Sequence, residues 1–187
     1  GILMKIIFGL HADGMNPHIK ENNIGVKTVG PNGFLNLLEA QLGIPVKAVS
    51  HTSRVISYSK RIEASGITGK FFEKSYLLDQ FNVAAELLSW RDQWYLAGWN
   101  SLINSPDQKR LFDIAAIENE THIALALSEG ERLQVVLSAL NNQKTQITKL
   151  QLIDSKCFFP KQWRHVISLF KGEQLDEVSS NAVEGSD

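Results

Sequence analysis

Apolar and polar residues follow one another in patterns that predict short strands near both ends of the chain. Residues 4–10, MKIIFGL, form a short β-branched and aromatic run followed by the turn-forming HADGMNPH, which is typical of a buried strand. Residues 25–30, GVKTVG, form a second extended run, and residues 147–154, ITKLQLID, alternate apolar and polar side chains. The sequence therefore predicts three strands, at these positions.

Apolar residues at steps of three and four predict helices across most of the interval between these strands. One helix begins near Phe34 and ends at Gly43, and Pro45 keeps it from continuing. Residues 75–99 have apolar side chains over more than half of the helical circumference, which predicts one long central helix. The same spacing predicts further helices at 51–64, 129–140 and 160–172.

Two helices can be predicted in more detail, one of those above and one further helix. In the helix at 51–64, the apolar side chains expected to point inward are Val55, Ile56 and Ile62. Another helix is predicted to start at Ser105-Pro106-Asp107-Gln108, with serine as the N-cap and glutamine in the capping-box position. Together the elements predict an α/β domain that is rich in helices and has a small sheet.

Composition and charge narrow the classes of function. The 187 residues are 43% hydrophobic and 21% charged, which is ordinary for a globular protein with a sizeable core. A formal net charge of -1 provides no overall attraction to nucleic acid or to an anionic membrane, so such binding needs a local basic patch. No apolar run approaches the ~20 residues of a membrane span, so no membrane partner is expected.

The single cysteine and the two ends of the chain also carry information. Cys157 has no partner for an internal disulfide, which suits a reducing, cytoplasmic setting, and it is predicted to be a small buried residue. Residues 172–187 are polar and acidic like a linker. Together with the opening GILMK, this tail suggests a piece of a longer protein.

Residues 29–43, VGPNGFLNLLEAQLG, have the layout of a phosphate-binding loop that runs into a helix. A P-loop requires Gly-x-x-x-x-Gly-Lys-Ser/Thr, because backbone amides and the lysine hold the phosphates while the hydroxyl holds magnesium. When the count starts at Gly25, the second glycine is Gly30, and Pro31 and Asn32 stand where lysine and Ser/Thr belong. Gly30, Pro31, Asn32 and Gly33 are thus a degenerate nucleotide loop or a purely structural turn, and ATP hydrolysis is not expected.

The later stretch KLQLIDSKCFFPKQWRHVISLFKG resembles motif II of the superfamily one helicases, in which a strand ends in Asp-Glu before a Pro-x-Gln-aromatic helix start. Asp154 matches the first acid, Ser155 replaces the glutamate, and Pro160, Gln162 and Trp163 match the helix start. The stretch from RIEASGITG to WYLAGW resembles the helical insertion of AddB- and RecC-type subunits.

From Met4 to about Lys171 the chain therefore resembles the N-terminal helicase-like domain of bacterial PD-(D/E)XK nuclease family proteins related to AddB. The resemblance implies a degenerate P-loop-helicase-like domain at 4–171, with a helical insertion at about 51–142 and a tail at 172–187. It also implies a non-catalytic scaffold and DNA-binding module for DNA repair, recombination or phage defence. The implied partners are DNA, a C-terminal nuclease remainder of the same protein and a helicase subunit.

A divergent Mg-dependent nuclease or NTPase is the first alternative. A nuclease centre needs an aspartate and an Asp/Glu-x-Lys element, so that carboxylates bind a metal beside a lysine. Asp107 with Asp154 and Lys156 provides the residue types of this motif. Asp107 is also explained as a first-turn residue favoured by the helix dipole. No cofactor is expected for this chain. Mg²⁺ is expected only if the full-length protein includes a nuclease domain.

His11, Asp13 and His18 are metal ligands by residue type, but the loop that contains them also has the composition of a polar turn. Without a cysteine or glutamate nearby, the turn is the preferred interpretation, and no metal is expected.

A basic helix is the candidate for weak, sequence-independent contact with DNA. Arg54, Lys60 and Arg61 surround Tyr58, and Lys70 and Lys74 extend the charge, so this stretch has cations for phosphates. Glutamates dilute the charge, which leaves an ordinary solvated face as the alternative.

The aromatic residues near the end of the long helix have two interpretations. Trp90, Trp94, Tyr95 and Trp99 could stack on bases, but their apolar neighbours favour a place in the core. A pure protein-interaction module is the second alternative function, and it predicts an exposed apolar patch.

Overall fold

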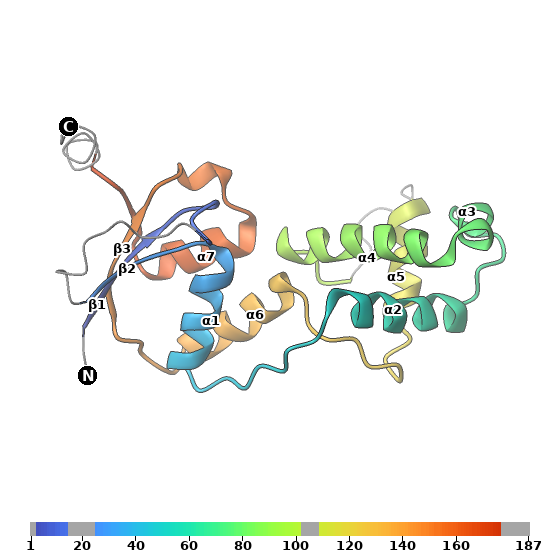
Figure 1. The fold of residues 1–187 in the computed structure, drawn as a ribbon, viewed down its shortest axis with the longest axis horizontal. Coiled ribbons are helices and arrows are strands. Elements are labelled where there is room, and N and C mark those ends of the chain that lie inside the picture. The colour runs from blue at the N-terminus through green and yellow to red at the C-terminus, as the bar shows by residue number, and fades with distance from the viewer. Residues whose placement is uncertain (1–2, 15–24, 102–108, 177–187) are drawn as a thin grey trace. The chain divides into compact units, whose positions relative to one another are not determined.

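The computed structural model describes residues 3–14, 25–101 and 109–176. The chain divides into two compact units (Figure 1). An α/β unit consists of Gly1–Val46 and Arg132–Asp187, and a helical unit consists of Lys47–Glu131. The second unit interrupts the first in sequence, where an insertion at about 51–142 was predicted.

The α/β unit contains a four-stranded parallel sheet in the order β2-β1-β3-β4. The strands are β1 (Met4–Phe8), β2 (Val26–Val29), β3 (Ile147–Leu152) and β4 (Glu173–Gln174). The first three confirm the predicted strands, and the helix-rich α/β class is confirmed with them. The fourth lies in the segment predicted to be a polar tail, because two exposed polar residues carry no periodic signal.

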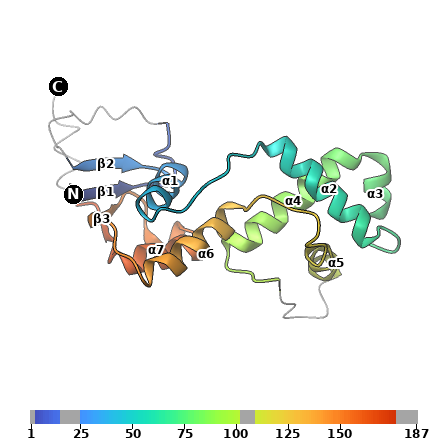
Figure 2. The ribbon, with the colours of Figure 1, turned by 90° about the horizontal axis from the view of Figure 1, so that it is seen from below.

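The core of this unit lies between the sheet and its helices. Alternate residues of β1, Ile6 and Phe8, point to one face and are fully buried. The ring of Phe8 lies 4.9 Å from that of Phe34 in α1 (Pro31–Gln41) and 4.8 Å from that of Trp163 in α7 (Lys161–Leu169). Helices α1 and α7 therefore cover the same face of the sheet (Figure 2).

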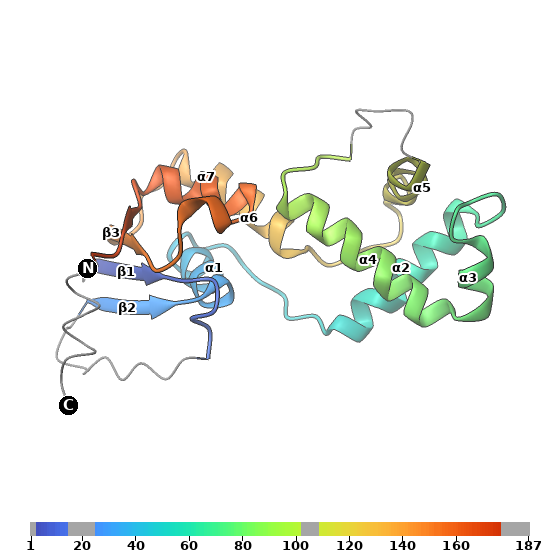
Figure 3. The same ribbon diagram turned by 90° about the horizontal axis from the view of Figure 1, so that it is seen from above.

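All strands are parallel, so the loops that follow them leave the sheet at one edge (Figure 3). The turn at Gly30 follows the edge strand β2, the loop containing Leu10 to Asp13 follows the inner strand β1, and Asp154 follows the inner strand β3. This carboxyl edge is where open α/β sheets usually bind ligands.

The helical unit packs around a separate apolar core. It contains α2 (His51–Ser65), α3 (Glu73–Leu78), α4 (Gln80–Leu96), α5 (Lys109–Glu118) and the first residues of α6 (Glu129–Leu140). Val55 and Ile62 are fully buried as predicted, but Ile56 is 47% exposed, so its predicted inward position is wrong.

The long helix predicted at 75–99 is broken at Asp79, which corrects the sequence prediction. Asp79 has φ -152° and ψ 80°, outside the helical region, and its carboxylate accepts hydrogen bonds from the backbone and the side chain of Asn82. Aspartate favours a helix N-cap over a helix interior because its side chain competes for backbone donors. The break leaves Leu77 and Leu78 exposed at the end of α3.

Candidate functional site

The glycine turn after β2 is held by a carboxylate from the loop after β1. Asp13 Oδ1 accepts hydrogen bonds from the backbone N–H groups of Gly30 and Gly33, both at 3.0 Å. Its Oδ2 accepts from the N–H of Asn32 at 2.8 Å, and Pro31 between them has no N–H to donate. Asp13 therefore caps the N-terminus of α1.

This contact determines whether the predicted nucleotide loop has N–H donors available for a phosphate. The N–H groups at the start of a helix are the donors that a bound phosphate needs. Here they are engaged by Asp13, which packs so closely that a Cβ on Gly30 would lie 2.4 Å from its carboxyl carbon. A phosphate at this turn would have to displace a carboxylate that the chain itself supplies.

Asp154 holds the other side of the same loop. Its Oδ2 accepts a hydrogen bond from the N–H of Leu10 at 2.7 Å, and its backbone carbonyl accepts one from the Gln174 side chain at 2.9 Å. The loop after β1 is thus attached to the Gly30 turn through Asp13 and to β3 through Asp154.

The residues proposed for a nuclease centre have other partners. The ammonium of Lys156 donates to Ser168 Oγ in α7 at 2.8 Å, whereas Asp154 accepts from Leu10. Asp107 lies outside the described residues. Of the two nuclease candidates that the structure describes, neither is hydrogen-bonded to the other.

The metal candidates were predicted to be parts of a polar turn. His11 is exposed and Asp13 caps α1, while His18 lies outside the described residues. Within the described ranges, no group of three or more His, Cys, Asp or Glu side chains could hold a metal ion.

The arginines of the predicted basic helix point into the helical unit. Arg54 makes two hydrogen bonds to the Asp92 carboxylate, at 2.6 and 3.1 Å, and a third to the carbonyl of Ala126 at 3.0 Å. Arg61 is 8% exposed and donates from Nε to the carbonyl of Ile123 at 2.7 Å. Both arginines attach the segment before α6 to α2.

The remaining candidates on this surface do not form one continuous basic face. Tyr58 is fully buried, so its ring is not available to stack on a base. Lys70 lies 3.9 Å from Asp113, which offsets part of its charge. Lys60 and Lys74 are exposed and keep their ammonium groups in solvent.

The aromatic residues of α4 pack within the helical unit, as their apolar neighbours predicted. Trp90 stacks on Phe71 with 6.2 Å between ring centroids and 16° between ring planes. Trp94 and Tyr95 both pack edge-on against Trp99, at 5.6 and 5.2 Å.

A buried ion cluster around Arg91 was not predicted from the sequence. Arg91 is 2% exposed and donates to Glu118 at 2.8 Å, to Glu131 at 2.6 Å and to Asp92 at 3.0 Å. The Tyr95 hydroxyl donates to the same Glu118 at 2.8 Å. The sequence feature that could have revealed this cluster was Arg91 itself, a charged residue on an apolar side of the predicted helix at 75–99.

The charges of this cluster stabilise one another. Burial works against the charged form of Arg91, but hydrogen bonds to Glu118 and Glu131 outweigh it, and the pKa of Arg91 is raised. Burial alone would raise the pKa of Glu131, yet the hydrogen bond from Arg91 lowers it. Burial and the hydrogen bond to Glu118 raise the pKa of Tyr95. The cluster therefore acts as a fixed ionic link between α4, α5 and α6.

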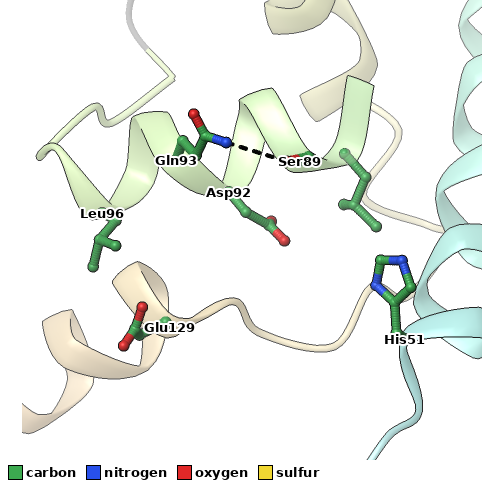
Figure 4. A pocket seen from close by; sticks show the side chains of 7 residues that line it. His51, Ser89, Asp92, Gln93, Leu96 and Glu129 are labelled. Carbon is green, nitrogen blue, oxygen red and sulfur yellow. Dashed lines mark hydrogen bonds between the residues drawn. The ribbon is translucent and has the colours of Figure 1, made fainter. Parts of the chain in front are cut away.

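A pocket of about 290 Å³ lies beside this cluster in the helical unit (Figure 4). Its polar lining includes His51, Asp92 and Glu129, and Gln93 donates to Ser89 at 3.2 Å. The carboxylate of Asp92 already accepts hydrogen bonds from Arg54 and Arg91. Asp92 is thus a structural anion at the pocket wall.

Cys157, predicted to be buried, is exposed, and its sulfur lies 3.3 Å from Ser155 Oγ. It sits in the short 3-10 turn η1 (Lys156–Phe158), in which none of the residues is buried.

No protein-family model matches the chain, and no curated protein matches it. None of the helices in the described ranges is long and apolar enough to cross a membrane.

Proposed function

We propose that this chain is a non-catalytic scaffold of a helicase- or nuclease-like DNA-processing protein, and that it contacts DNA without sequence preference. The observation that carries the proposal is the Asp13 carboxylate on the N–H groups of Gly30, Asn32 and Gly33. A nucleotide-binding loop presents such donors to phosphate. In this chain they stabilise a turn instead.

The contacts between the two segments with helicase-like motifs also support a scaffold, because they hold the loops of the sheet in place. The Gly30 turn and Asp154 are joined through the loop after β1, by way of Asp13 and Leu10. Each motif position thus fixes the shape of the carboxyl edge of the sheet. A helicase-like architecture that is kept for its shape is consistent with these contacts.

The test of the proposal combines binding with activity assays. Fluorescence anisotropy with labelled single-stranded and forked DNA is expected to show binding that weakens steeply between about 50 and 200 mM salt. Phosphate release with ATP and plasmid nicking with Mg²⁺ or Mn²⁺ are expected to stay at background.

Absence of DNA binding at low salt would overturn the DNA role. Activity above background that disappears in Asp154→Ala would overturn the non-catalytic role, because the variant assigns that activity to this chain. The matched control is Glu173→Ala, which removes an exposed carboxylate of the same unit and leaves the hydrogen bonds of Asp13 and Asp154 in place.

A protein-interaction module is the second candidate, and a specific surface favours it. Leu77, Leu78 and Phe81 are 62%, 88% and 47% exposed within five residues of chain. Exposed apolar residues that gather in one place mark interaction sites. This function predicts no shift of labelled DNA, and binding of a protein partner that is lost in Leu77→Ser with Leu78→Ser but kept in Val135→Ser.

A further inference from the structure

Helix α7 has two faces of opposite character. Its buried residues are Gln162, Trp163, Val166 and Ile167, which pack toward the core of the α/β unit. Its exposed residues include Lys161, Arg164, His165 and Ser168. These four are spaced by three and four positions, so they lie on one face of the helix.

A further cation joins this exposed face from outside the helix. The ammonium of Lys156, in the turn η1, donates to Ser168 Oγ at 2.8 Å. This contact places the charge of Lys156 at Ser168, about one helical turn from Arg164 and about two turns from Lys161 on the same face. The cations of the η1 turn and of α7 are thus gathered on one surface.

Acidic residues flank the segment that carries this positive charge but do not lie within it, since Asp154 precedes the segment and Glu173 follows it. The sequence contains no aspartate or glutamate from Ser155 to Gly172. None of the ion pairs among the described residues involves Lys156, Lys161 or Arg164. A chain with a net charge of -1 therefore carries a local basic patch of the kind that binding to a polyanion requires.

An exposed aromatic ring stands next to these cations. Phe158 is 70% exposed, whereas its neighbour Phe159 is 2% exposed and packs against Phe8 with 4.9 Å between ring centroids. The buried ring of Phe159 anchors the turn, and the ring of Phe158 is left in solvent.

We propose that the η1 turn and the exposed face of α7 bind single-stranded nucleic acid. This α7 basic face consists of Lys156, Phe158, Lys161, Arg164 and His165. Its cations neutralise phosphates, and Phe158 stacks on an unpaired base, which is the combination that single-strand-binding proteins use. The inference rests on the proposed DNA contact and assigns it to a surface other than helix α2.

The chemistry of this face favours a single strand over an anionic membrane. A helix that lies on a membrane inserts its apolar side among the lipids. The apolar side of α7 is already used, since Trp163 is 1% exposed and Ile167 is fully buried. What remains exposed is mainly charge, with Leu169 of α7 and the ring of Phe158 as large apolar groups, 53% and 70% exposed. A single exposed leucine does not give the helix an apolar side that could insert among lipids, whereas the cations and the ring match phosphates and a base.

Charge reversal at two positions tests the location. Lys161→Glu with Arg164→Glu is compared with Lys60→Glu with Lys74→Glu, which makes the same change in net charge on exposed lysines of the helical unit. The probe is a labelled oligo(dT) of roughly 20 nucleotides, measured by anisotropy over a range of salt. The comparison separates the effect of position from that of total charge.

The α7 pair is expected to weaken binding by at least about tenfold and to reduce the slope of log affinity against log salt by about 1.4, because two phosphate contacts are lost. The helical-unit pair is expected to stay within about twofold of the wild type. Lys161→Gln with Arg164→Gln provides a milder variant, expected to show a smaller loss in the same direction, should the charge reversal prevent folding.

Phe158→Ala tests the stacking. It is expected to weaken binding to oligo(dT) by about fivefold or more and to change binding to duplex DNA little, because paired bases are not free to stack on the ring. Phe158→Tyr keeps an aromatic ring and is expected to bind oligo(dT) about as well as the wild type.

Three results would overturn the inference, and they separate it from the proposed function. If Lys161→Glu with Arg164→Glu keeps the wild-type affinity and Lys60→Glu with Lys74→Glu loses it, the DNA role stands but this surface is refuted. Absence of any DNA binding would refute both. Binding to phosphatidylserine vesicles without binding to oligo(dT) would identify a lipid surface instead.

Discussion

The carboxylate of Asp13 accepts a hydrogen bond from the backbone N–H of Gly30 at 3.0 Å, across 17 positions of sequence. Gly30 is the N-cap residue of α1 and has no side chain with which to cap the helix itself. The cap therefore comes from another part of the fold, and the start of α1 depends on the loop after β1.

Removing the Asp13 carboxylate is expected to destabilise the α/β unit. Asp13→Ala leaves the N–H groups of Gly30, Asn32 and Gly33 without this acceptor and should lower the free energy of unfolding by about 1–2 kcal/mol. Urea unfolding measures the loss. Glu173→Ala, which removes an exposed carboxylate from the same unit, is expected to change stability much less, and equal losses would contradict the cap.

Two neighbouring glycines are expected to respond differently to alanine. In Gly30→Ala the new Cβ would lie 2.4 Å from both the backbone nitrogen and the carboxyl carbon of Asp13, so the loop must shift, at a cost of about 1–3 kcal/mol. In Gly33→Ala the nearest atom is a carboxyl oxygen of Asp13 at 3.1 Å. A thermal melt of both variants should show the larger drop for Gly30→Ala, and the reverse order would refute the packing.

The arginines of α2 are expected to act in folding rather than on a free surface. Arg54→Met breaks the hydrogen bonds to Asp92 and Ala126 in a partly buried site and should cost about 2–4 kcal/mol in the free energy of unfolding. Lys60→Met, on an exposed position of the same helix, should cost less than about 0.5 kcal/mol. Similar values for the two variants in urea unfolding would show that the Arg54 contacts contribute little.

The ion cluster predicts how stability depends on pH. The pKa of Glu131 is lowered in the folded protein, so the unfolded chain binds protons more readily at this site on acidification. Its contribution is present above the ordinary glutamate range and is lost as the pH falls below about 5. Urea midpoints measured from neutral to acidic pH should therefore decrease.

Glu131→Gln should lower stability near neutral pH and flatten this decrease, because the variant has no carboxylate to protonate. Glu86→Gln, on an exposed position of α4, is the control and should leave the pH dependence unchanged. An unaltered acid dependence in Glu131→Gln would show that other groups are responsible.

The strands β1, β2 and β3 and most of the helices were predictable from the sequence, because periodic burial leaves its mark on consecutive residues. The helix break at Asp79 was the exception within a strongly periodic stretch. There one capping side chain outweighed the apolar pattern on both sides of it.

The roles of the polar residues were decided by the tertiary structure. The sequence shows that Asp13, Arg54 and Arg91 are charged, but their partners Gly30, Asp92 and Glu131 lie 17, 38 and 40 positions away in the chain. No periodicity encodes which distant donor and acceptor meet. Local patterns therefore determined where the chain forms strands and helices. Only the folded chain determined which charges are buried with partners and which, like Lys161 and Arg164 of α7, are exposed.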